Sequence, residues 1–378
     1  MLTTPARTLS GVLAVLAAVA SAAATPDSLP PQQHSHRTTS ASAGCGKSHK
    51  PGYHYYNEHG NFSIISGGLS RYYSVQVPVA YDASETHALI FDYHGNSDTS
   101  TEQHNNSQYY NYAASQDYVV IYPQGLDRHW EGPTYAVAGI DDLQFTTDLL
   151  AHVQAQYCID SDRVYGKYQV QSVYMRPLLT VMQYVSSFSE TVWWDITQGL
   201  HLTFGQASGK SNGGGFVDTL ACSDHGDSFA AFAMASAALY TDVNRTDCSK
   251  KHAIIESHGD QDTVIPYRGG QGSGGPLPNV GEWVSWWGER NCGEDAEAQT
   301  SGDLGGYNIT SYSCSGFENV TQHYHFAQLG HCWPNGFGDN YDAVHLTSQH
   351  CSEVRVLDYT PVVLDFFGRW DLKCAPKK

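Results

Sequence analysis

The stretch Gly209-Lys210-Ser211-Asn212-Gly213, continued by Gly214-Gly215-Phe216-Val217, decides the fold prediction. A serine in the pattern Gly-x-Ser-x-Gly is typical of a nucleophile elbow, a strained turn between a β-strand and an α-helix. The flanking glycines let neighbouring backbone pass where a Cβ would collide. The pattern alone also fits a glycine-rich surface turn, but the apolar, helix-compatible residues 216–221 favour the elbow.

Short apolar runs alternate with helix-like stretches along the rest of the chain. The predicted strands are residues 70–79, 88–93, 118–122, 163–165 and 252–257, and residues 141–157 are a predicted amphipathic helix. Such alternation predicts a mostly parallel sheet with helices on both faces, and catalytic loops collect at the carboxyl ends of its strands. We therefore predict an α/β fold of the α/β-hydrolase type, in one catalytic domain over residues 44–378.

The first 43 residues and the cysteines indicate the compartment. Residues 1–24 combine Arg7, an apolar run and small residues, as in a cleavable secretory signal, and residues 25–43 are a polar, Pro-rich flexible leader. Nine cysteines behind a signal indicate disulfides, and the odd number leaves at least one thiol free or paired between chains. Five sequons are candidate glycosylation sites: Asn61, Asn105, Asn244, Asn308 and Asn319. We expect a secreted, extracellular protein.

The charge balance excludes two classes of partner. Twenty Lys and Arg against 38 Asp and Glu give a net charge of −18. An acidic chain repels phosphate backbones and anionic lipid surfaces, so neither nucleic acid nor a membrane is expected as a partner. The oligomeric state stays open.

Two candidate partners of Ser211 follow it in the chain. A serine hydroxyl needs a base to take its proton and an acid to orient that base, and α/β-hydrolases supply them in the order Ser, Asp, His. Asp262 lies in a loop after the predicted strand 252–257, with Asp260 assigned to holding that loop. His331, in Gly330-His331-Cys332-Trp333, is the candidate base.

The segment Tyr93-His94-Gly95-Asn96 follows the predicted strand 88–93, where the second oxyanion donor is normally built. Backbone N–H groups of Asn212 and of Gly95 or Asn96 are therefore the candidate oxyanion donors. No cofactor is expected. The pairs His34/His36 and His323/His325 could suggest a metal, but the sequence gives them no cysteine or carboxylate company, so no metal site is predicted.

A set of ordered blocks carries a family resemblance. The blocks are Phe91-Asp92-Tyr93-His94-Gly95-Asn96, Tyr122-Pro123-Gln124-Gly125, Asp141-Asp142-Leu143-Gln144-Phe145, Cys158-Ile159-Asp160-Ser161-Asp162-Arg163-Val164-Tyr165, the elbow, His258-Gly259-Asp260-Gln261-Asp262 and Gly330-His331-Cys332-Trp333-Pro334. From about Cys45 to Trp370 the chain resembles fungal feruloyl esterases, in the carbohydrate esterase group that also holds acetylxylan esterases.

The resemblance implies a serine esterase that hydrolyses ferulate (hydroxycinnamate) esters on plant cell-wall polysaccharides such as arabinoxylan, through an acyl-enzyme. Its partner would be a feruloylated polysaccharide or oligosaccharide. Acetylxylan esterase and polyester depolymerase are the alternatives within the enzyme class. They differ in the shape of the acyl pocket, which the sequence does not give.

Residues 167–206 depart from the resemblance. In the family, Arg-Val-Tyr runs within a few residues into the elbow, but here about 40 residues intervene after Tyr165. The edges of this insert can be encoded by intron boundary sequences, so a retained intron is one hypothesis and an evolved lid the other. We expect the insert to break the strand side of the turn, and a secreted glycoprotein with a disabled elbow is the non-enzymatic alternative.

Overall fold

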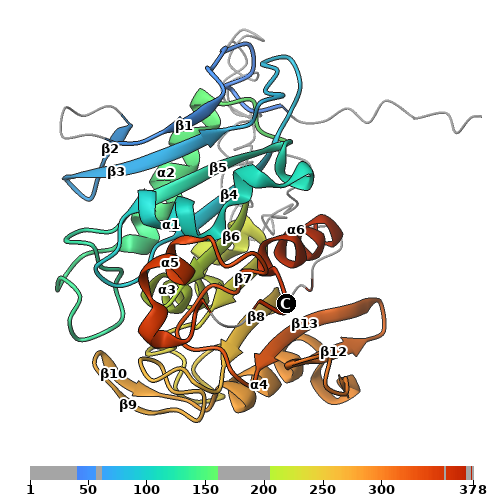
Figure 1. Ribbon diagram of the computed structural model, residues 1–378. Helices are drawn as coiled ribbons and strands as arrows, with labels where there is room; N and C mark the ends of the chain where they lie inside the picture. The colour runs from blue at the N-terminus through green and yellow to red at the C-terminus, as the bar shows by residue number, and fades with distance from the viewer. Residues whose placement is uncertain (1–40, 57–61, 161–204, 353–354, 372–375, 377–378) are drawn as a thin grey trace, which may run out of the picture. The chain divides into compact units, whose positions relative to one another are not determined.

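The structure is a computed structural model that describes residues 41–56, 62–160, 205–352, 355–371 and 376 (Figure 1). The predicted signal 1–24, most of the leader 25–43, the predicted strand 163–165 and all but two residues of the insert 167–206 lie outside this part. Asn61 and Cys374 also lie outside it.

The core element is one mixed sheet. Its strands are β1 (Gly52–His54), β2 (Ser63–Ser66), β3 (Leu69–Val77), β4 (Ala88–Tyr93), β5 (Tyr118–Gln124), β6 (Gly205–Lys210), β7 (Phe229–Ala235), β8 (Ala253–Gly259), β11 (Glu297–Thr300), β12 (Tyr307–Cys314) and β13 (Phe317–Phe326). They lie in the order β1-β3-β5-β4-β6-β7-β8-β13-β12-β11, and β2 pairs with β3. From β5 to β13 every pairing is parallel, and antiparallel strands close both edges. A short hairpin, β9 (Gly270–Gly272) and β10 (Gly275–Leu277), lies apart.

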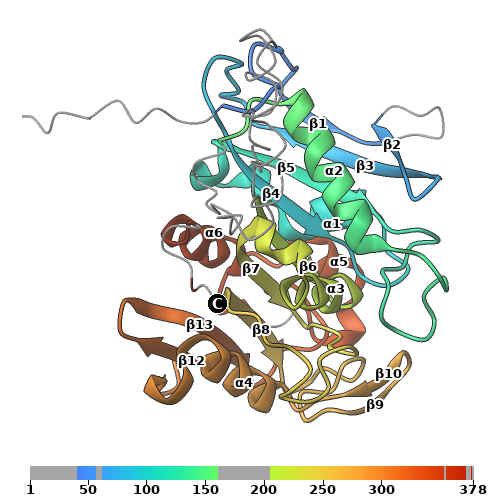
Figure 2. The same ribbon diagram turned by 180° about the vertical axis from the view of Figure 1, so that it is seen from behind.

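Helices pack on both faces of this sheet, as Figure 1 and the reverse view in Figure 2 show. The α-helices are α1 (Ser100–Ser107), α2 (Asp142–Gln156), α3 (Asn212–Ala221), α4 (Val280–Cys292), α5 (Tyr341–His345) and α6 (Tyr359–Arg369). The 3-10 helices are η1 (Tyr109–Asn111), η2 (Ala113–Ser115), η5 (His225–Ser228), η6 (Gly293–Asp295) and η7 (Thr347–Gln349).

Strand β4 illustrates why the sheet is covered on both sides. Its side chains alternate: Leu89, Phe91 and Tyr93 pack in the core that contains residues of α2, α3 and α4. Ala88 and Ile90 pack in a second core that contains residues of α6. A strand buried on both faces reads as a continuous apolar run, which is what residues 88–91 are.

The predicted fold class is confirmed, and most of the predicted elements appear with shifted ends. The predicted strand 88–93 has its predicted bounds in β4, and the predicted helix 141–157 is α2, capped by the Asp141 side chain, which accepts from the N–H of Gln144. The leader was expected to end at residue 43, but Ala41 already pairs with Asp160, so the folded part begins earlier.

The expectation that the insert breaks the strand side of the elbow is wrong. Gly205 and Gln206, assigned to the insert from the sequence, are the first two residues of β6, and Gln206 pairs with Ile90 of β4. Backbone hydrogen bonds form the ladder whatever the side chain, so these two residues complete the strand. Strand, turn and helix are therefore consecutive around Ser211.

In the described part of the chain, four disulfides link all eight cysteines: Cys45–Cys158, Cys222–Cys248, Cys292–Cys314 and Cys332–Cys351. The sequence alone did not determine which cysteines form these pairs. Among the described residues, no helix has both the length and the apolar character needed to cross a membrane.

Candidate active site

Ser211 occupies a strained turn between β6 and α3. Its φ of 55° and ψ of −120° are a backbone conformation that a residue with a side chain rarely adopts. Two glycines allow it. A Cβ on Gly209 would lie 2.6 Å from the carbonyl oxygen of Gly213, and a Cβ on Gly213 would lie 2.3 Å from that of Tyr93. The glycines therefore bring the turn against the end of β4.

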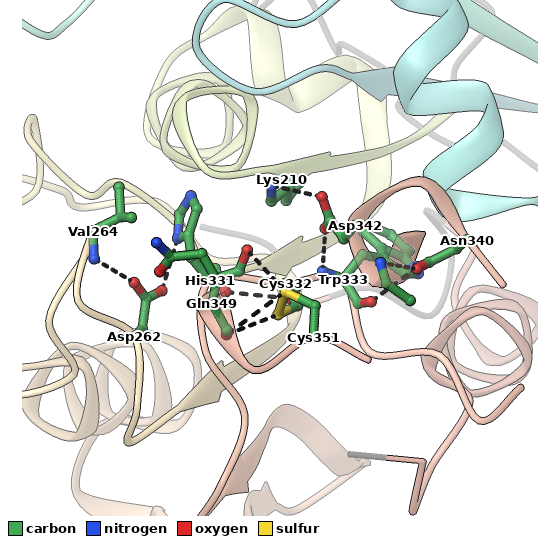
Figure 3. Close-up of a disulfide and its surroundings, with 12 residues drawn as sticks. Lys210, Asp262, Val264, His331, Cys332, Trp333, Asn340, Asp342, Gln349 and Cys351 are labelled. Carbon is green, nitrogen blue, oxygen red and sulfur yellow. Dashed lines mark hydrogen bonds and ion pairs between the residues drawn. A yellow bond between two sulfur atoms is a disulfide. The ribbon is translucent and has the colours of Figure 1, made fainter. Parts of the chain in front are cut away.

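Asp262 and His331, from two different loops, form a hydrogen-bonded pair (Figure 3). The Nδ1 atom of His331 lies 2.8 Å from Oδ2 of Asp262. The other carboxylate oxygen, Oδ1, accepts from the N–H groups of Val264 at 2.9 Å and Ile265 at 2.8 Å. Both side chains are buried, with exposed fractions of 3% for Asp262 and 6% for His331. The carboxylate is thus fixed with one oxygen facing the imidazole.

Asp262 is held in its ionised form. Burial alone would raise the pKa of its carboxyl, but the charge of His331 and hydrogen bonds from His258 and His331 outweigh burial and lower the pKa. An ionised carboxylate at Nδ1 fixes the imidazole tautomer and leaves Nε2 as the nitrogen available to accept a proton.

The elbow and the His331 loop meet at the carboxyl edge of the sheet. Lys210 Nζ contacts Oδ1 of Asp342 at 3.0 Å, and Oδ2 of Asp342 accepts from the N–H of Trp333 at 2.6 Å. One carboxylate therefore joins the residue before Ser211 to a residue two after His331.

A second connection runs through the end of β7. Ser211 N–H donates to the carbonyl oxygen of Ala235, and the Ser236 hydroxyl donates to that of Cys332 at 3.3 Å. Adjacent residues at the end of β7 thus bind the elbow and the His331 loop.

The loop after β4 lies against Ser211. A Cβ on Gly95 would be 3.5 Å from Cβ of Ser211 and 2.7 Å from Oδ2 of Asp98. Trp130 ties this loop to the elbow: its indole N–H donates to the carbonyl oxygen of His94 at 2.9 Å, and its backbone N–H donates to Oδ1 of Asn212 at 2.8 Å. Trp130 therefore links Asn212 to the residue before Gly95, whereas the neighbouring Asn96 is exposed.

His94 is neutral because a hydrogen-bond acceptor faces one of its ring nitrogens and a donor faces the other. Nδ1 donates to the carbonyl oxygen of Gly95 at 2.7 Å, and Nε2 accepts from the N–H of Gly125 at 2.9 Å. Complete burial lowers the pKa of this imidazole to about 4, with smaller contributions from His129 and Arg128. The neutral ring links the loop after β4 to the loop after β5.

The remaining predicted residues lie apart from this centre. Asp260 contacts His325, at 3.0 Å, and not His331. His323 and His325 were expected to lack carboxylate neighbours, and this is wrong: His323 contacts Glu256 at 2.8 Å, and His325 contacts Asp260. These carboxylate neighbours could not be predicted from the sequence, because they come from β8 and the loop after it, about 65 residues away along the chain.

Within the described residues, one group of potential metal ligands comprises Asp218, Cys222 and Asp242. The sulfur of Cys222 is bonded to Cys248, so it offers no thiolate. Of the candidate glycosylation sites, Asn105 and Asn244 are exposed, and Asn308 and Asn319 are half-buried.

Sequence reasoning missed the residues that position the centre: Lys210, Asp342, Trp130 and Asp98. Lys210 lies inside the elbow motif, and an apolar residue would suit a buried strand end better, so a lysine there was a signal that a partner carboxylate exists. Burial raises the pKa of Asp98, which lies near the positive charge of Lys210 and the negative charge of Asp342.

Ser211 follows β6, Asp262 follows β8 and His331 follows β13, so three parallel strands deliver these side chains to one edge of the sheet. This sheet, with its strand–turn–helix elbow and helices on both faces, is an α/β-hydrolase fold.

No protein-family model and no curated protein matches the chain. Similar solved structures include an acetyl xylan esterase from Aspergillus awamori, at 13% identity over 71% of this chain and 93% of that one, with a TM-score of 0.44. A feruloyl esterase module from Clostridium thermocellum complexed with sinapinate has 12% identity over 82% and 97%, with a TM-score of 0.40. An S-formylglutathione hydrolase from Staphylococcus aureus has 14% identity over 57% and 82%, with a TM-score of 0.36. At these values the likenesses carry no argument about function.

Proposed function

We propose that this protein is a serine esterase in which Ser211 is the nucleophile, His331 the base and Asp262 the residue that orients the base. The observation that carries the proposal is the strained φ of Ser211 at the same sheet edge as the buried His331–Asp262 pair. Ser211 would attack the ester carbonyl while His331 takes its proton, and the alcohol would leave with a proton returned by His331. Water would then hydrolyse the acyl-enzyme by the same route.

The developing oxyanion would be held by backbone N–H groups of Asn212 and of Gly95 or Asn96. The first N–H groups of a helix have no partner within it, and Asn212 is the first residue of α3. Each such donor contributes about 3 kcal/mol to stabilising the transition state. The proposed reaction uses no cofactor.

The test of the mechanism is turnover of a simple ester, p-nitrophenyl acetate, by matched variants. Ser211→Ala, Asp262→Asn and His331→Ala should each lower kcat/KM by about a thousandfold or more, with unchanged folding. Asp260→Asn is the control, since Asp260 contacts His325 instead of His331. Near-normal turnover in one of the three variants would remove that residue from the site, and an Asp260→Asn defect larger than that of Asp262→Asn would reverse the choice of acid.

For the substrate we propose ferulate esters of plant cell-wall polysaccharide, with acetylated xylan as the alternative. The sequence blocks support this choice. Apolar side chains near the elbow form a buried cluster of Ala238, Tyr240, Ile265 and Leu277, with the half-buried Tyr135 packed against it. Ala238 N–H donates to the carbonyl oxygen of Ser211 at 2.9 Å, so the cluster adjoins the elbow. Aromatic and aliphatic side chains suit a flat phenolic acyl group.

Release of ferulate from methyl ferulate and of acetate from acetylated xylan should be compared on one preparation. Tyr135→Ala should raise KM for methyl ferulate and leave p-nitrophenyl acetate nearly unchanged. Rapid deacetylation of xylan without ferulate release would assign the protein to the acetylxylan esterases instead.

The alternative of a disabled elbow is tested by deleting residues 167–206, which removes the Gln206 that now pairs with Ile90 and joins residue 166 to Ala207. If the insert is a translated intron, the deletion should raise both the yield of soluble protein and the turnover per folded molecule. Full-length protein that is active and loses activity on deletion would make the insert part of the substrate site. A full-length chain that is inactive while the shortened chain is active would support the disabled form.

We also propose that the protein is secreted and carries glycans, with Asn105 and Asn244 the most accessible acceptors. The four disulfides support an oxidising compartment. Expression of the full chain in a eukaryotic secretory host should place it in the medium, with a mass that falls on endoglycosidase treatment. Retention in the cell without glycan would contradict this.

A further inference from the structure

Two neighbouring strands gather four titratable side chains behind Asp262. Glu256 and His258 lie two residues apart on β8 and therefore share one face of the sheet. On the parallel strand β13, His323 is the register partner of Glu256, and His325 is that of His258. Glu256, His258 and His323 are almost fully buried, and nothing in the proposed mechanism uses them.

Both ring nitrogens of His258 face acceptors. Nδ1 lies 3.0 Å from Oε1 of Glu256, and Nε2 lies 2.8 Å from the carbonyl oxygen of Ile265 and 3.3 Å from Oδ2 of Asp262. A neutral imidazole has only one N–H, so one nitrogen would direct a lone pair at an oxygen lone pair. The doubly protonated imidazolium is the form that satisfies both sides.

We propose that His258 is a permanently charged positioning residue that shares the Asp262 carboxylate with His331 and extends the esterase activity toward acidic pH. This inference rests on the proposed roles of Asp262 and His331. The imidazolium of His258 opposes a second positive charge on the same carboxylate. Removing the charge of His258 should therefore change the pH dependence of the site, while Glu256 neutralises that charge from the far side.

The electrostatics of the buried cluster agree with this charge assignment. Burial would lower the pKa of His258, but the charge of Glu256 and the hydrogen bonds to Asp262 and Glu256 outweigh it and raise the pKa to about 10. Burial would raise the pKa of Glu256, but His258 and His323 outweigh it and lower the pKa to about 2. Within the described residues, the other titratable and charged groups near this cluster are Tyr267, Tyr359, Asp260, Asp262, Lys210 and His331.

The size of the effect follows from the shared oxygen. Since Nε2 of His258 and Nδ1 of His331 both contact Oδ2 of Asp262, the two nitrogens are at most about 6 Å apart, and two charges at that distance shift a titration by about 1 to 2 pH units. Replacing His258 by glutamine removes the charge but keeps a side-chain amide that can donate to Asp262 or Ile265. The acid limb of kcat/KM should then move to higher pH by about that amount.

The experiment is the pH profile of kcat/KM with p-nitrophenyl acetate for full-length wild type, His258→Gln and His325→Gln. The His325→Gln control removes the register partner of His258, which contacts Asp260 and stacks on Tyr267 without touching Asp262. An acid limb moved upward in His258→Gln and unmoved in His325→Gln supports the proposal. An unmoved limb in an active His258→Gln enzyme overturns it and leaves the proposed function intact.

Two further measurements cover the remaining outcomes. If His258→Gln does not fold, the double variant Glu256→Gln with His258→Gln replaces the ion pair by a neutral hydrogen-bonded pair, and its acid limb should move in the same direction. Nitrogen-15 NMR of wild type, with the His258 signal assigned by its loss in the variant, should show both ring nitrogens protonated at pH 8. A neutral His258 at that pH overturns the inference, and a wild type with no ester turnover at any pH overturns the proposed function and this inference with it.

Discussion

The ion pair between Lys210 and Asp342 gives the sharpest prediction about how the site is held. Both side chains are buried, with exposed fractions of 3% and 1%, and their contact is 3.0 Å. Burial would lower the pKa of Lys210, but the charges of Asp342 and Asp98 outweigh it and raise the pKa, so the lysine is charged. Asp342 also accepts from Asn106 Nδ2 at 3.0 Å and from the N–H of Trp333. Asp342→Asn keeps the shape of the side chain that joins these three residues and removes its negative charge.

The expected loss of stability is set by the cation that remains. Removing one member of a buried ion pair costs about 3–5 kcal/mol, because the other charge stays buried without compensation. Two features place Asp342→Asn at the lower end: Asp98 still lies near Lys210, and the asparagine Oδ1 can still accept from the Trp333 N–H. We therefore expect the free energy of unfolding to fall by about 3 kcal/mol.

Urea unfolding of wild type, Asp342→Asn, Lys210→Met and the double variant forms a cycle that isolates the pair. The double variant should recover most of the lost stability, since neither charge remains. An Asp342→Asn protein within about 0.5 kcal/mol of wild type, or a double variant no more stable than the single, would refute the reasoning.

Three more predictions test other parts of the site. Gly213→Ala puts a Cβ 2.3 Å from the carbonyl oxygen of Tyr93, and the backbone there has no room to move away. The free energy of unfolding should fall by about 3 kcal/mol, and ester turnover should fall as well. An unaffected variant would mean that the turn is not tightly packed against the end of β4. His94 has a folded-state pKa of about 4 against an ordinary 6.5, so its contribution to stability is complete above pH 6.5 and is lost as the pH falls toward 4. Between pH 6.5 and pH 4, the free energy of unfolding should therefore fall by about 3 kcal/mol less in His94→Gln than in wild type, as measured by urea titrations. Equal falls in the two proteins would contradict a neutral His94. Replacing Cys332 and Cys351 together by alanine removes a disulfide that closes a loop with a sequence separation of 19. The free energy of unfolding, measured by calorimetry or urea, should therefore fall by about 3 kcal/mol. No change would mean that this disulfide does not stabilise the fold.

The sequence predicted only some of the elements that short-range patterns encode, because the apolar and fully buried strand β7 (Phe229–Ala235) was not among the predicted strands. The predicted strand 88–93 and helix 141–157 were found because their side chains are continuously apolar or periodic, and the glycines around Ser211 marked the turn. The antiparallel strands β11 and β12 were not predicted. Their side chains are exposed or half-buried, so they lack the apolar run that marks a buried strand.

The supporting residues of the site escaped prediction for a different reason. Asp342 meets Lys210 across 132 positions of sequence, and Glu256 meets His323 across 67. No local pattern encodes such a contact, because it depends on which strands become neighbours. The pairing register of β8 with β13 decides it, and register is fixed by the whole sheet.

The charge of a buried histidine shows where the limit of sequence reasoning lies. His94 and His258 both precede a glycine, both lie at the carboxyl end of a parallel strand, and both are fully buried. The pKa of His94 is about 4 and that of His258 about 10. Burial acts on both rings in the same direction, so the difference comes from the partners: an N–H group donates to one nitrogen of His94, whereas a carboxylate or carbonyl oxygen faces each nitrogen of His258. The same His-Gly dipeptide thus supplies a neutral imidazole beside the candidate oxyanion donors and a positively charged imidazolium in contact with Asp262. The sequence around the two histidines does not distinguish these charge states, but the contacts in the folded protein do.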